Sequence, residues 1–232
     1  MAKATREAYG ETLKELGAQI PEIVVLDADL SASTKTAVFA KAFPDRFFDT
    51  GIAEGNMMSV AAGLAASGKI PFASTFAVFG AGRAYEQIRN SICYPNLNVK
   101  VAVTHAGLTV GEDGATHQML EDIALMRALP NMTVVVPADA AETAQVIRWA
   151  ASYQGPVYIR MGRAKVEDVI SPDAEFVPGK STTLADGSDV TIMACGIMTQ
   201  QALHAAKMLA EEGISARVIN MSSIKPIDEA AI

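Results

Sequence analysis

Glu54 is the residue whose surroundings in the sequence best suit proton transfer. It follows Gly51-Ile52-Ala53 and precedes a run of small and apolar residues that continues to Ala66. A helix that is apolar on all sides is buried, often where another subunit approaches. Desolvation favours the neutral form of a carboxyl group, so Glu54 can share a proton with a ligand. A glutamate in a first helical turn also stabilises a helix through the dipole alone, and that alternative stays open here.

A second group of candidates is formed by His105 and His117, two of the three histidines in the chain. They flank the loop sequence Gly111-Glu112-Asp113-Gly114 at the end of an apolar run. Open α/β sheets bind ligands at the carboxyl ends of their strands, which favours a site over two unrelated core histidines.

Two aromatic residues, Phe76 and Phe79, are three positions apart. On a helical turn this spacing places them on the same side, although a pair of core aromatics has the same spacing. The cysteines, Cys93 and Cys195, lie in apolar runs without a CxxC motif, which is typical of buried small hydrophobic residues.

The elements that must position these residues alternate between strands and helices. Continuous β-branched runs predict buried strands over 24–26, 70–72, 99–103, 132–136 and 156–161. Apolar residues at helical spacing predict helices over 5–17, 34–42, 56–67, 81–92, 120–129 and 141–153. This alternation predicts an α/β fold with a parallel sheet covered by helices on both faces.

A change of composition divides the chain. We predict a first domain over 1–165, a linker over 166–188 rich in Ser, Pro, Gly and Asp, and a second α/β unit over 189–232. The second unit has strands over 190–194 and 216–219, a helix over 199–212, and a helix that starts at Asp228. A single βαβ unit cannot bury its own apolar faces, so we expect the natural chain to be longer.

Composition excludes several classes of protein. The 232 residues carry a net charge of -7, which argues against a broad nucleic-acid surface. No apolar run approaches the roughly 20 residues of a membrane span, and the polar start has no signal-peptide core. We therefore expect a cytoplasmic protein that binds neither nucleic acid nor membrane.

Five ordered segments resemble the transketolase family. Gly51-Ile52-Ala53-Glu54 resembles its glutamate motif, and Ala28-Asp29-Leu30-Ser31-Ala32-Ser33 its Ala-Asp-Leu loop. Ser74-Thr75-Phe76-Ala77-Val78-Phe79 is similar to its cofactor segment. The most specific match covers 104–118, where Gly-Glu-Asp-Gly-Ala-Thr-His-Gln follows Thr-His. The fifth match, Leu129-Pro130-Asn131-Met132 together with Pro137-Ala138-Asp139, follows in order.

The resemblance implies a fold that binds the pyrimidine end of thiamine diphosphate. In the family, a glutamate hydrogen-bonds N1′ of the aminopyrimidine ring, and this role falls on Glu54. Phe79, and Phe76 beside it, would pack against that ring, and Asp29 would belong to the same cofactor site. A dry, rigid carboxylate suits this chemistry.

The resemblance also implies a sugar-phosphate site. His117 and Asp113 would contact hydroxyls of the donor ketose, with His117 also in a catalytic role. The phosphate end would meet four residues: Arg6, Ser33, His105 and Arg163. Guanidinium groups suit phosphate because their planar donors match its oxygens.

Three features depart from the family pattern. Gly55 replaces a usual His or Gln after the glutamate, and Gly82 stands where a third cofactor-packing aromatic is common, with Tyr85 nearby as a substitute. The family's Gly-Asp-Gly followed by Asn, which holds Mg²⁺ and the diphosphate, is absent, and so is a complete dinucleotide fingerprint. We therefore expect no metal ligands in this chain and Mg²⁺ held by a partner subunit.

Together these features predict the C-terminal subunit of a split transketolase. It would act with an N-terminal subunit in a heterotetramer, moving a two-carbon ketol unit from a ketose phosphate to an aldose phosphate. The alternatives are a 1-deoxyxylulose-5-phosphate synthase-like enzyme, a 2-oxo-acid dehydrogenase beta subunit, and a non-catalytic partner subunit.

Overall fold

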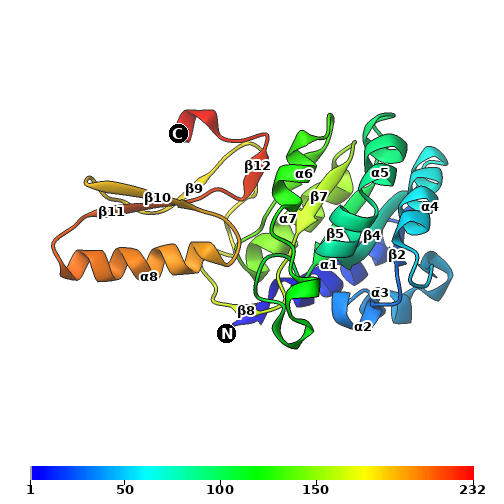
Figure 1. Ribbon diagram of the computed structural model, residues 1–232, viewed down its shortest axis with the longest axis horizontal. Coiled ribbons are helices and arrows are strands. Elements are labelled where there is room, and N and C mark those ends of the chain that lie inside the picture. The colour runs from blue at the N-terminus through cyan, green and yellow to red at the C-terminus, as the bar shows by residue number, and fades with distance from the viewer. Residues whose placement is uncertain (1) are drawn as a thin grey trace.

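Parallel strands form the main sheet of the molecule, as the continuous apolar runs predict (Figure 1). The computed structural model describes residues 2–232. Within them the main sheet has seven strands in the order β12-β6-β7-β5-β4-β2-β3, all parallel to their neighbours except β12. Their bounds are β2 Ile23–Asp27, β3 Phe47–Asp49, β4 Ile70–Phe76, β5 Lys100–Thr104, β6 Thr133–Val135, β7 Val157–Arg160 and β12 Ser223–Lys225.

Helices cover both faces of this sheet. Their bounds are α1 Thr5–Gln19, α2 Ser31–Thr34, α3 Ala37–Ala42, α4 Glu54–Ala66, α5 Tyr85–Gln87, α6 Asp122–Ala128 and α7 Ala140–Ser152. One core joins α1, α3 and α7 to the sheet through residues such as Tyr9, Phe39 and Ile147, and the other joins α4 and α6 through Met58 and Met126. Every residue of β2 and β5 is buried, as strands covered on both faces require. The predicted α/β fold with a parallel sheet is confirmed.

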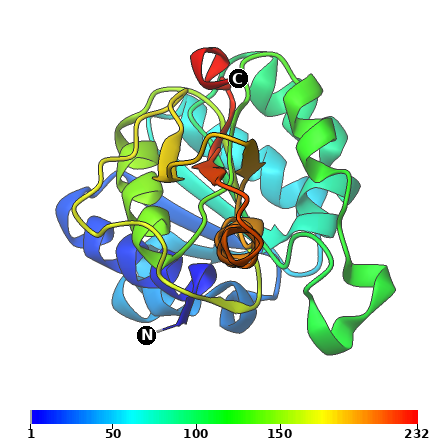
Figure 2. The ribbon, with the colours of Figure 1, turned by 90° about the vertical axis from the view of Figure 1, so that its left-hand side faces the viewer.

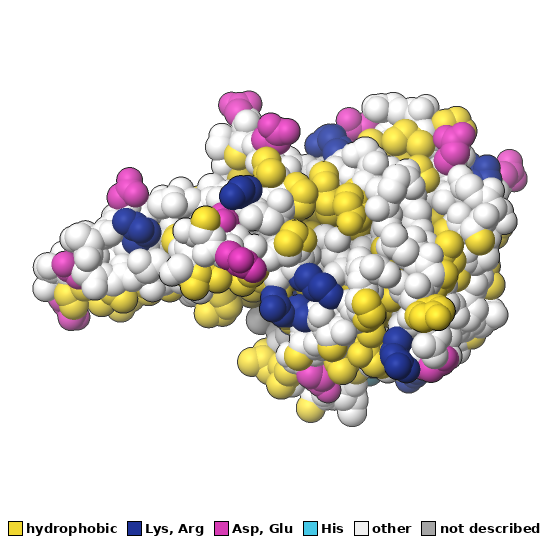
Figure 3. Space-filling view, turned by 90° about the horizontal axis from the view of Figure 1, so that it is seen from above, with side chains coloured by type: hydrophobic (Ala, Val, Ile, Leu, Met, Phe, Trp, Pro, Cys, Tyr) yellow, Lys and Arg dark blue, Asp and Glu magenta, His cyan; other side chains and the backbone are white. Residues whose placement is uncertain are grey.

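A smaller unit projects from this body as a narrow arm (Figures 1 and 3). Its parallel strands β10 Val190–Ala194 and β11 Ala216–Asn220 are joined by α8 Met198–Glu211, which Figure 2 shows end-on in front of the main sheet. Hydrophobic side chains lie along one edge of the arm in Figure 3, and the exposed apolar residues of this unit include Val190, Met193, Met198 and Met208. The predicted second α/β unit therefore exists, with apolar surface left uncovered within this chain.

The boundary between the two units is less simple than composition predicts. Strand β9, Thr182–Ala185, lies inside the stretch predicted as linker and pairs antiparallel with β11. Strand β12 follows β11 yet pairs with β6 of the main sheet. The short pair β1 Lys3–Ala4 and β8 Lys165–Val166 was also not predicted, because such short strands carry no periodic signal. The helix expected from Asp228 is a single 3₁₀ turn, Glu229–Ala231.

Buried polar contacts hold the arm against the main body. The side-chain amide of Asn220 donates to Glu142 Oε1 at 2.9 Å, and Asn220 Oδ1 accepts from the Thr199 hydroxyl at 3.0 Å. Burial raises the pKa of Glu142. Asp139 caps α7 and also accepts from the backbone of Val169, so the predicted linker is held to the body where it begins.

Two predicted helices are interrupted. The stretch 34–42 divides into α2 and α3 at Lys35, which has a left-handed φ of 73°. Gly10 lets helix α1 pack tightly against this break, because a Cβ at this position would lie only 2.5 Å from the carbonyl oxygen of Lys35. The stretch 81–92 becomes two π-helical turns, Val78–Arg83 and Ile88–Cys93, on either side of α5.

Helix α4 is only half covered within this chain. Met57, Met58 and Ala61 are buried against the sheet, whereas Ser59 and Val60 on the opposite side are exposed. The expectation of burial on all sides is therefore wrong for the chain alone, because small apolar residues do not by themselves identify which neighbour covers them.

Candidate active site

The carboxyl ends of the parallel strands bring the predicted site residues to one edge of the sheet. The segments that leave β2, β3, β4, β5 and β7 carry, in that order, Asp29, Glu54, Phe79, His105 and Arg163. Parallel strands end at the same edge, so residues far apart in sequence meet there. Arg6 joins them from the first turn of α1.

Asp27, at the end of β2, holds the loop that contains Asp29 and Ser33. Its carboxylate accepts hydrogen bonds from the backbone N–H of Leu30 at 2.7 Å and from the hydroxyls of Thr34 and Thr36 at 2.7 and 2.8 Å. Burial raises the pKa of Asp27 to about 6 despite these donors. The loop that carries two predicted site residues is thus fixed to the sheet.

Asp49 links that loop to the segment that leads into Glu54. Its Oδ1 accepts from the backbone N–H of Asp29 at 3.0 Å and of Gly51 at 2.9 Å. Asp29 has a left-handed φ of 61°, which this bond helps to maintain. The Asp29 side chain is exposed to solvent. Its cofactor role stays a prediction.

Four rings form a continuous aromatic cluster beside this edge. Phe76 stacks on His105 with ring centroids 3.7 Å apart, and on Phe79 at 6.0 Å with the planes inclined by 11°. His117 meets Phe79 edge-on at 5.4 Å. The structure thus brings the predicted aromatics and the predicted histidines into one group, with Phe76 at the end of β4 rather than on a helical turn.

A π-helical turn positions Phe79 and Arg83. The backbone N–H of Ala84 donates to the carbonyl of Phe79, five residues earlier, at 3.1 Å. Gly80 lets the turn lie against β5, because a Cβ there would approach Val103 to 2.9 Å. The Arg83 guanidinium lies over the Phe79 ring, 4.7 Å from its centroid.

Glu54 is buried and ion-paired with Arg83. The Glu54 side chain is 2% exposed, and Arg83 Nη1 lies 3.1 and 3.3 Å from its two carboxylate oxygens. Glu54 is thus buried, as its sequence surroundings predict, while its role toward a cofactor stays a prediction. Arg83 is a neighbour that the sequence did not indicate. The only signal in the sequence is a basic residue four positions after Phe79, within the predicted helix 81–92.

Two arginines converge near His105. Arg6 donates to the backbone carbonyl of Ser33 at 2.8 Å, so Ser33 is brought to the site through its main chain. Burial and then the charge of Arg163 lower the pKa of Arg6. The Nε of Arg6 is buried without a hydrogen-bond partner among residues 2–232. Two close guanidinium groups with an unpaired donor favour an anionic ligand.

His105 is held neutral in this cluster. Its pKa is lowered to about 4, first by burial of the ring and then by the charge of Arg6, while Asp113 acts in the opposite direction. Its Nδ1 lies 2.9 Å from the Thr104 hydroxyl, and its φ of 57° is left-handed. A neutral imidazole keeps one ring nitrogen as donor and the other as acceptor.

We expect the His105 ring to show no titration above about pH 5, since its pKa lies near 4. Arg6→Gln removes a positive neighbour and should move this pKa upward, toward the ordinary 6.5. Histidine NMR spectra recorded against pH measure both effects. A His105 that titrates near 6.5 in the unsubstituted protein would contradict the neutral assignment.

Asp113 and His117 lie on a loop that stands out from the body between β5 and α6 (Figure 2). A backbone bridge between Gly107 and Met119 closes its base. Beneath it, Asp122 accepts from Arg160 Nε at 2.7 Å in a buried ion pair. Asp113 is exposed at the tip, whereas His117 is half-buried against Phe79, and contact of either residue with a ligand stays a prediction.

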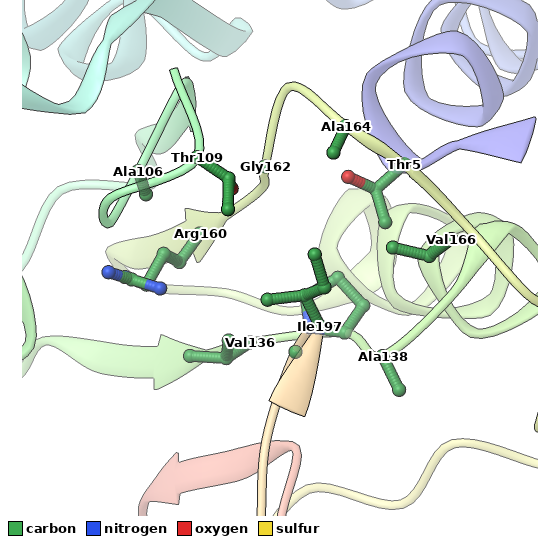
Figure 4. Close-up of a pocket in the computed structure, with 12 residues that line it drawn as sticks. Thr5, Ala106, Thr109, Val136, Ala138, Arg160, Gly162, Ala164, Val166 and Ile197 are labelled. Carbon is green, nitrogen blue, oxygen red and sulfur yellow. The ribbon is translucent and has the colours of Figure 1, made fainter. Parts of the chain in front are cut away.

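A small cavity lies between the segments that follow β5 and β7 and the start of α1 (Figure 4). Its volume of about 30 Å³ suits a water molecule rather than a cofactor. Thr5, Ala106 and Gly162 line it, each next in sequence to a predicted phosphate ligand. Ile197 of the arm closes the opposite side, so the arm packs directly against the segments that carry the site.

Several expectations have different outcomes in detail. Tyr85, the suggested substitute for a third aromatic, is half-buried against the core and donates its hydroxyl to the carbonyl of Leu125. Gly82 leaves open space beside Met119, and Gly55 lies against Gln87. Among residues 2–232, no group of three or more His, Cys, Asp or Glu is arranged to hold a metal ion. Within the same range no helix is long and apolar enough to cross a bilayer.

Two models of known protein families match this chain. The model of the transketolase pyrimidine-binding domain matches residues 1–168, and that of the transketolase C-terminal domain matches 179–232. The chain belongs to the transketolase family. The resemblance first drawn from five short motifs is thereby confirmed.

Similar proteins point to a C-terminal section. A protein of Methanocaldococcus jannaschii with the provisional name transketolase C-terminal section is 56% identical over 232 residues, 99% of this chain and 73% of that protein. An apulose-4-phosphate transketolase component from Phocaeicola vulgatus is 44% identical over 230 residues, 99% of this chain and 74% of that protein. A solved split gene transketolase, described as an inactive beta4 tetramer, is 65% identical, with a TM-score of 0.91 over 100% of this chain and 75% of its own. This chain is thus a transketolase-family C-terminal section with a thiamine-diphosphate-type fold.

Proposed function

We propose that this chain is the C-terminal subunit of a split transketolase that transfers a two-carbon ketol unit from a ketose phosphate to an aldose phosphate. The observation that carries the proposal is the shared edge of the sheet. There a buried carboxylate, a wall of aromatic rings and two converging guanidinium groups lie side by side. A proton-sharing group, a surface for a flat ring and an anion site are what this reaction requires.

The residues present fit the pyrimidine end of thiamine diphosphate. Glu54 supplies a dry carboxyl group for N1′, and Phe79 presents a ring face on which the planar guanidinium of Arg83 already lies. Phe76 supports Phe79 from behind by stacking. When bound, the cofactor supplies the nucleophilic carbon of its thiazolium ring. Glu54 holds the proton at N1′, and the rings exclude water from the site.

The residues around His105 suit the sugar phosphate. Arg6 and Arg163 would hold the phosphate, with the unpaired Nε of Arg6 as one donor. His117 and Asp113, on the exposed loop, would contact hydroxyls of the donor ketose. His105, held neutral, can both donate and accept a hydrogen bond to the substrate.

The sequence lacks the family's Gly-Asp-Gly followed by Asn, the motif that holds the diphosphate and Mg²⁺. We assign them to an N-terminal subunit in a heterotetramer. The exposed side of α4 supports assembly, since Ser59, Val60 and Gly63 let another chain approach closely. Ile52, 76% exposed just before Glu54, extends this apolar surface to the site. The 65% identical relative, whose beta4 tetramer is described as inactive, supports a requirement for a second kind of subunit.

We expect the isolated chain to bind thiamine diphosphate weakly and to show no turnover. Adding the N-terminal subunit should tighten binding by roughly two orders of magnitude or more. The gain should be that large because charge-assisted contacts to the diphosphate are worth about 1.5–3 kcal/mol each. Isothermal titration with thiamine diphosphate and Mg²⁺, with and without the partner, measures this.

The same titration separates the alternatives. Tight, Mg²⁺-dependent binding by this chain alone would overturn the split-enzyme proposal. Tight binding by the complex without ketol transfer would instead favour a non-catalytic subunit. A titration without Mg²⁺ is the control, because only the diphosphate contacts should depend on the metal.

A further inference from the structure

Arg83 occupies both surfaces that the proposed cofactor ring would use. Its Nη1 lies between the two carboxylate oxygens of Glu54, and its guanidinium covers the face of Phe79. Among residues 2–232, no second cation pairs with Glu54. A ring that hydrogen-bonds Glu54 and packs on Phe79 therefore has to displace Arg83.

The exposure of the two partners shows which one can move. Glu54 is 2% exposed and belongs to α4, whereas Arg83 is 54% exposed at the end of a π-helical turn. A long side chain that is half in solvent can rotate away without opening the core, but a buried carboxylate cannot. A buried carboxylate without a partner is costly, so Arg83 stabilises the site while no ligand is present.

We propose that Arg83 is a positioning residue that occupies the site of the aminopyrimidine ring while no cofactor is bound. This inference rests on the proposed function. Arg83 holds the Glu54 carboxylate in the ligand-free subunit and leaves it when the cofactor binds. The ion pair then opposes cofactor binding by the free energy needed to break it. Assembly with the partner subunit has to supply that free energy through the diphosphate contacts.

Substitution of Arg83 tests this in two states of the protein. In the isolated chain, Arg83→Gln should lower Tm, because Glu54 loses its cation. The Glu54→Gln/Arg83→Gln double variant should regain part of the loss. In the assembled complex, Arg83→Gln should bind thiamine diphosphate about two- to fivefold more tightly, the range expected for a partly exposed ion pair. Titration calorimetry provides a measurement that does not depend on turnover.

Arg148→Gln is the matched control. Arg148 is 47% exposed, similar to Arg83, and pairs at 2.8 Å with half-exposed Glu15 between α1 and α7, so the substitution removes an arginine ion pair away from the site. It should leave cofactor affinity unchanged. Unchanged or weaker affinity in Arg83→Gln would overturn the inference.

The Glu54 and Arg83 variants together distinguish failure of the inference from failure of the proposed function. If Glu54→Gln abolishes exchange of the cofactor C2 proton while Arg83→Gln leaves affinity unchanged, the function stands and Arg83 is only a surface partner. If Glu54→Gln leaves exchange normal, the function itself fails, whatever Arg83 does. In the Glu54→Gln background, Arg83→Gln should no longer tighten binding, because the ion pair is already gone.

Discussion

Glu54→Gln should reduce cofactor activation in the reconstituted complex by at least about a hundredfold, the usual contribution of a positioned proton-transfer group. Glutamine has the size of glutamate and can still accept a hydrogen bond from Arg83, but it cannot share a proton with N1′. The measurement is hydrogen–deuterium exchange at C2 of bound thiamine diphosphate, compared between the unsubstituted and substituted complexes.

The fold should survive this change. A first-turn glutamate contributes only about 0.3–1 kcal/mol through the helix dipole, and the apolar residues of α4 stay packed. Glu86→Gln, which changes an exposed first-turn glutamate of α5, is the control and should exchange normally. Near-normal exchange in Glu54→Gln would show that Glu54 only stabilises its helix.

Arg163→Ala should lower activity on phosphorylated sugars roughly ten- to a hundredfold while affecting free sugars far less. One charge-assisted contact to phosphate is worth about 1.5–3 kcal/mol, and a free sugar does not make it. The Arg163 guanidinium lies beside the loop that carries Asp113 and His117. A Cβ built on Gly111 of that loop would lie 2.6 Å from Arg163 Nη1. The comparison of kcat/KM for the two substrate types measures the effect.

Lys165→Ala provides the control for this substitution. Lys165 is an exposed cation two positions along the same segment, in β8. Its loss should leave the ratio of the two kcat/KM values unchanged. An equal loss on both substrate types in Arg163→Ala would assign Arg163 to the structure of the loop rather than to the phosphate.

Arg83 illustrates why part of the site could not be predicted from the sequence. Its contact with Glu54 joins residues 29 positions apart through a π-helical turn, and the sequence pattern there is equally compatible with an ordinary α-helix. The neutral state of His105 likewise depends first on burial of its ring and then on the charge of Arg6, which lies far away in the chain. Tyr85 is suggested as a substitute aromatic by its proximity in sequence, whereas the structure packs it against the core.

The sequence by itself determined the fold class, the family and the set of candidate residues. Continuous apolar strands between helical segments have to form a sheet whose two faces are both covered by helices. Parallel strands that end at the same edge of that sheet bring Glu54, Phe79 and His105 together there. Only the tertiary structure decided which of these touch. It stacked Phe76 on His105, paired Arg83 with Glu54 and joined β12 to the main sheet. Local patterns record which face of an element is buried, whereas contacts between distant segments depend on how all the elements pack together.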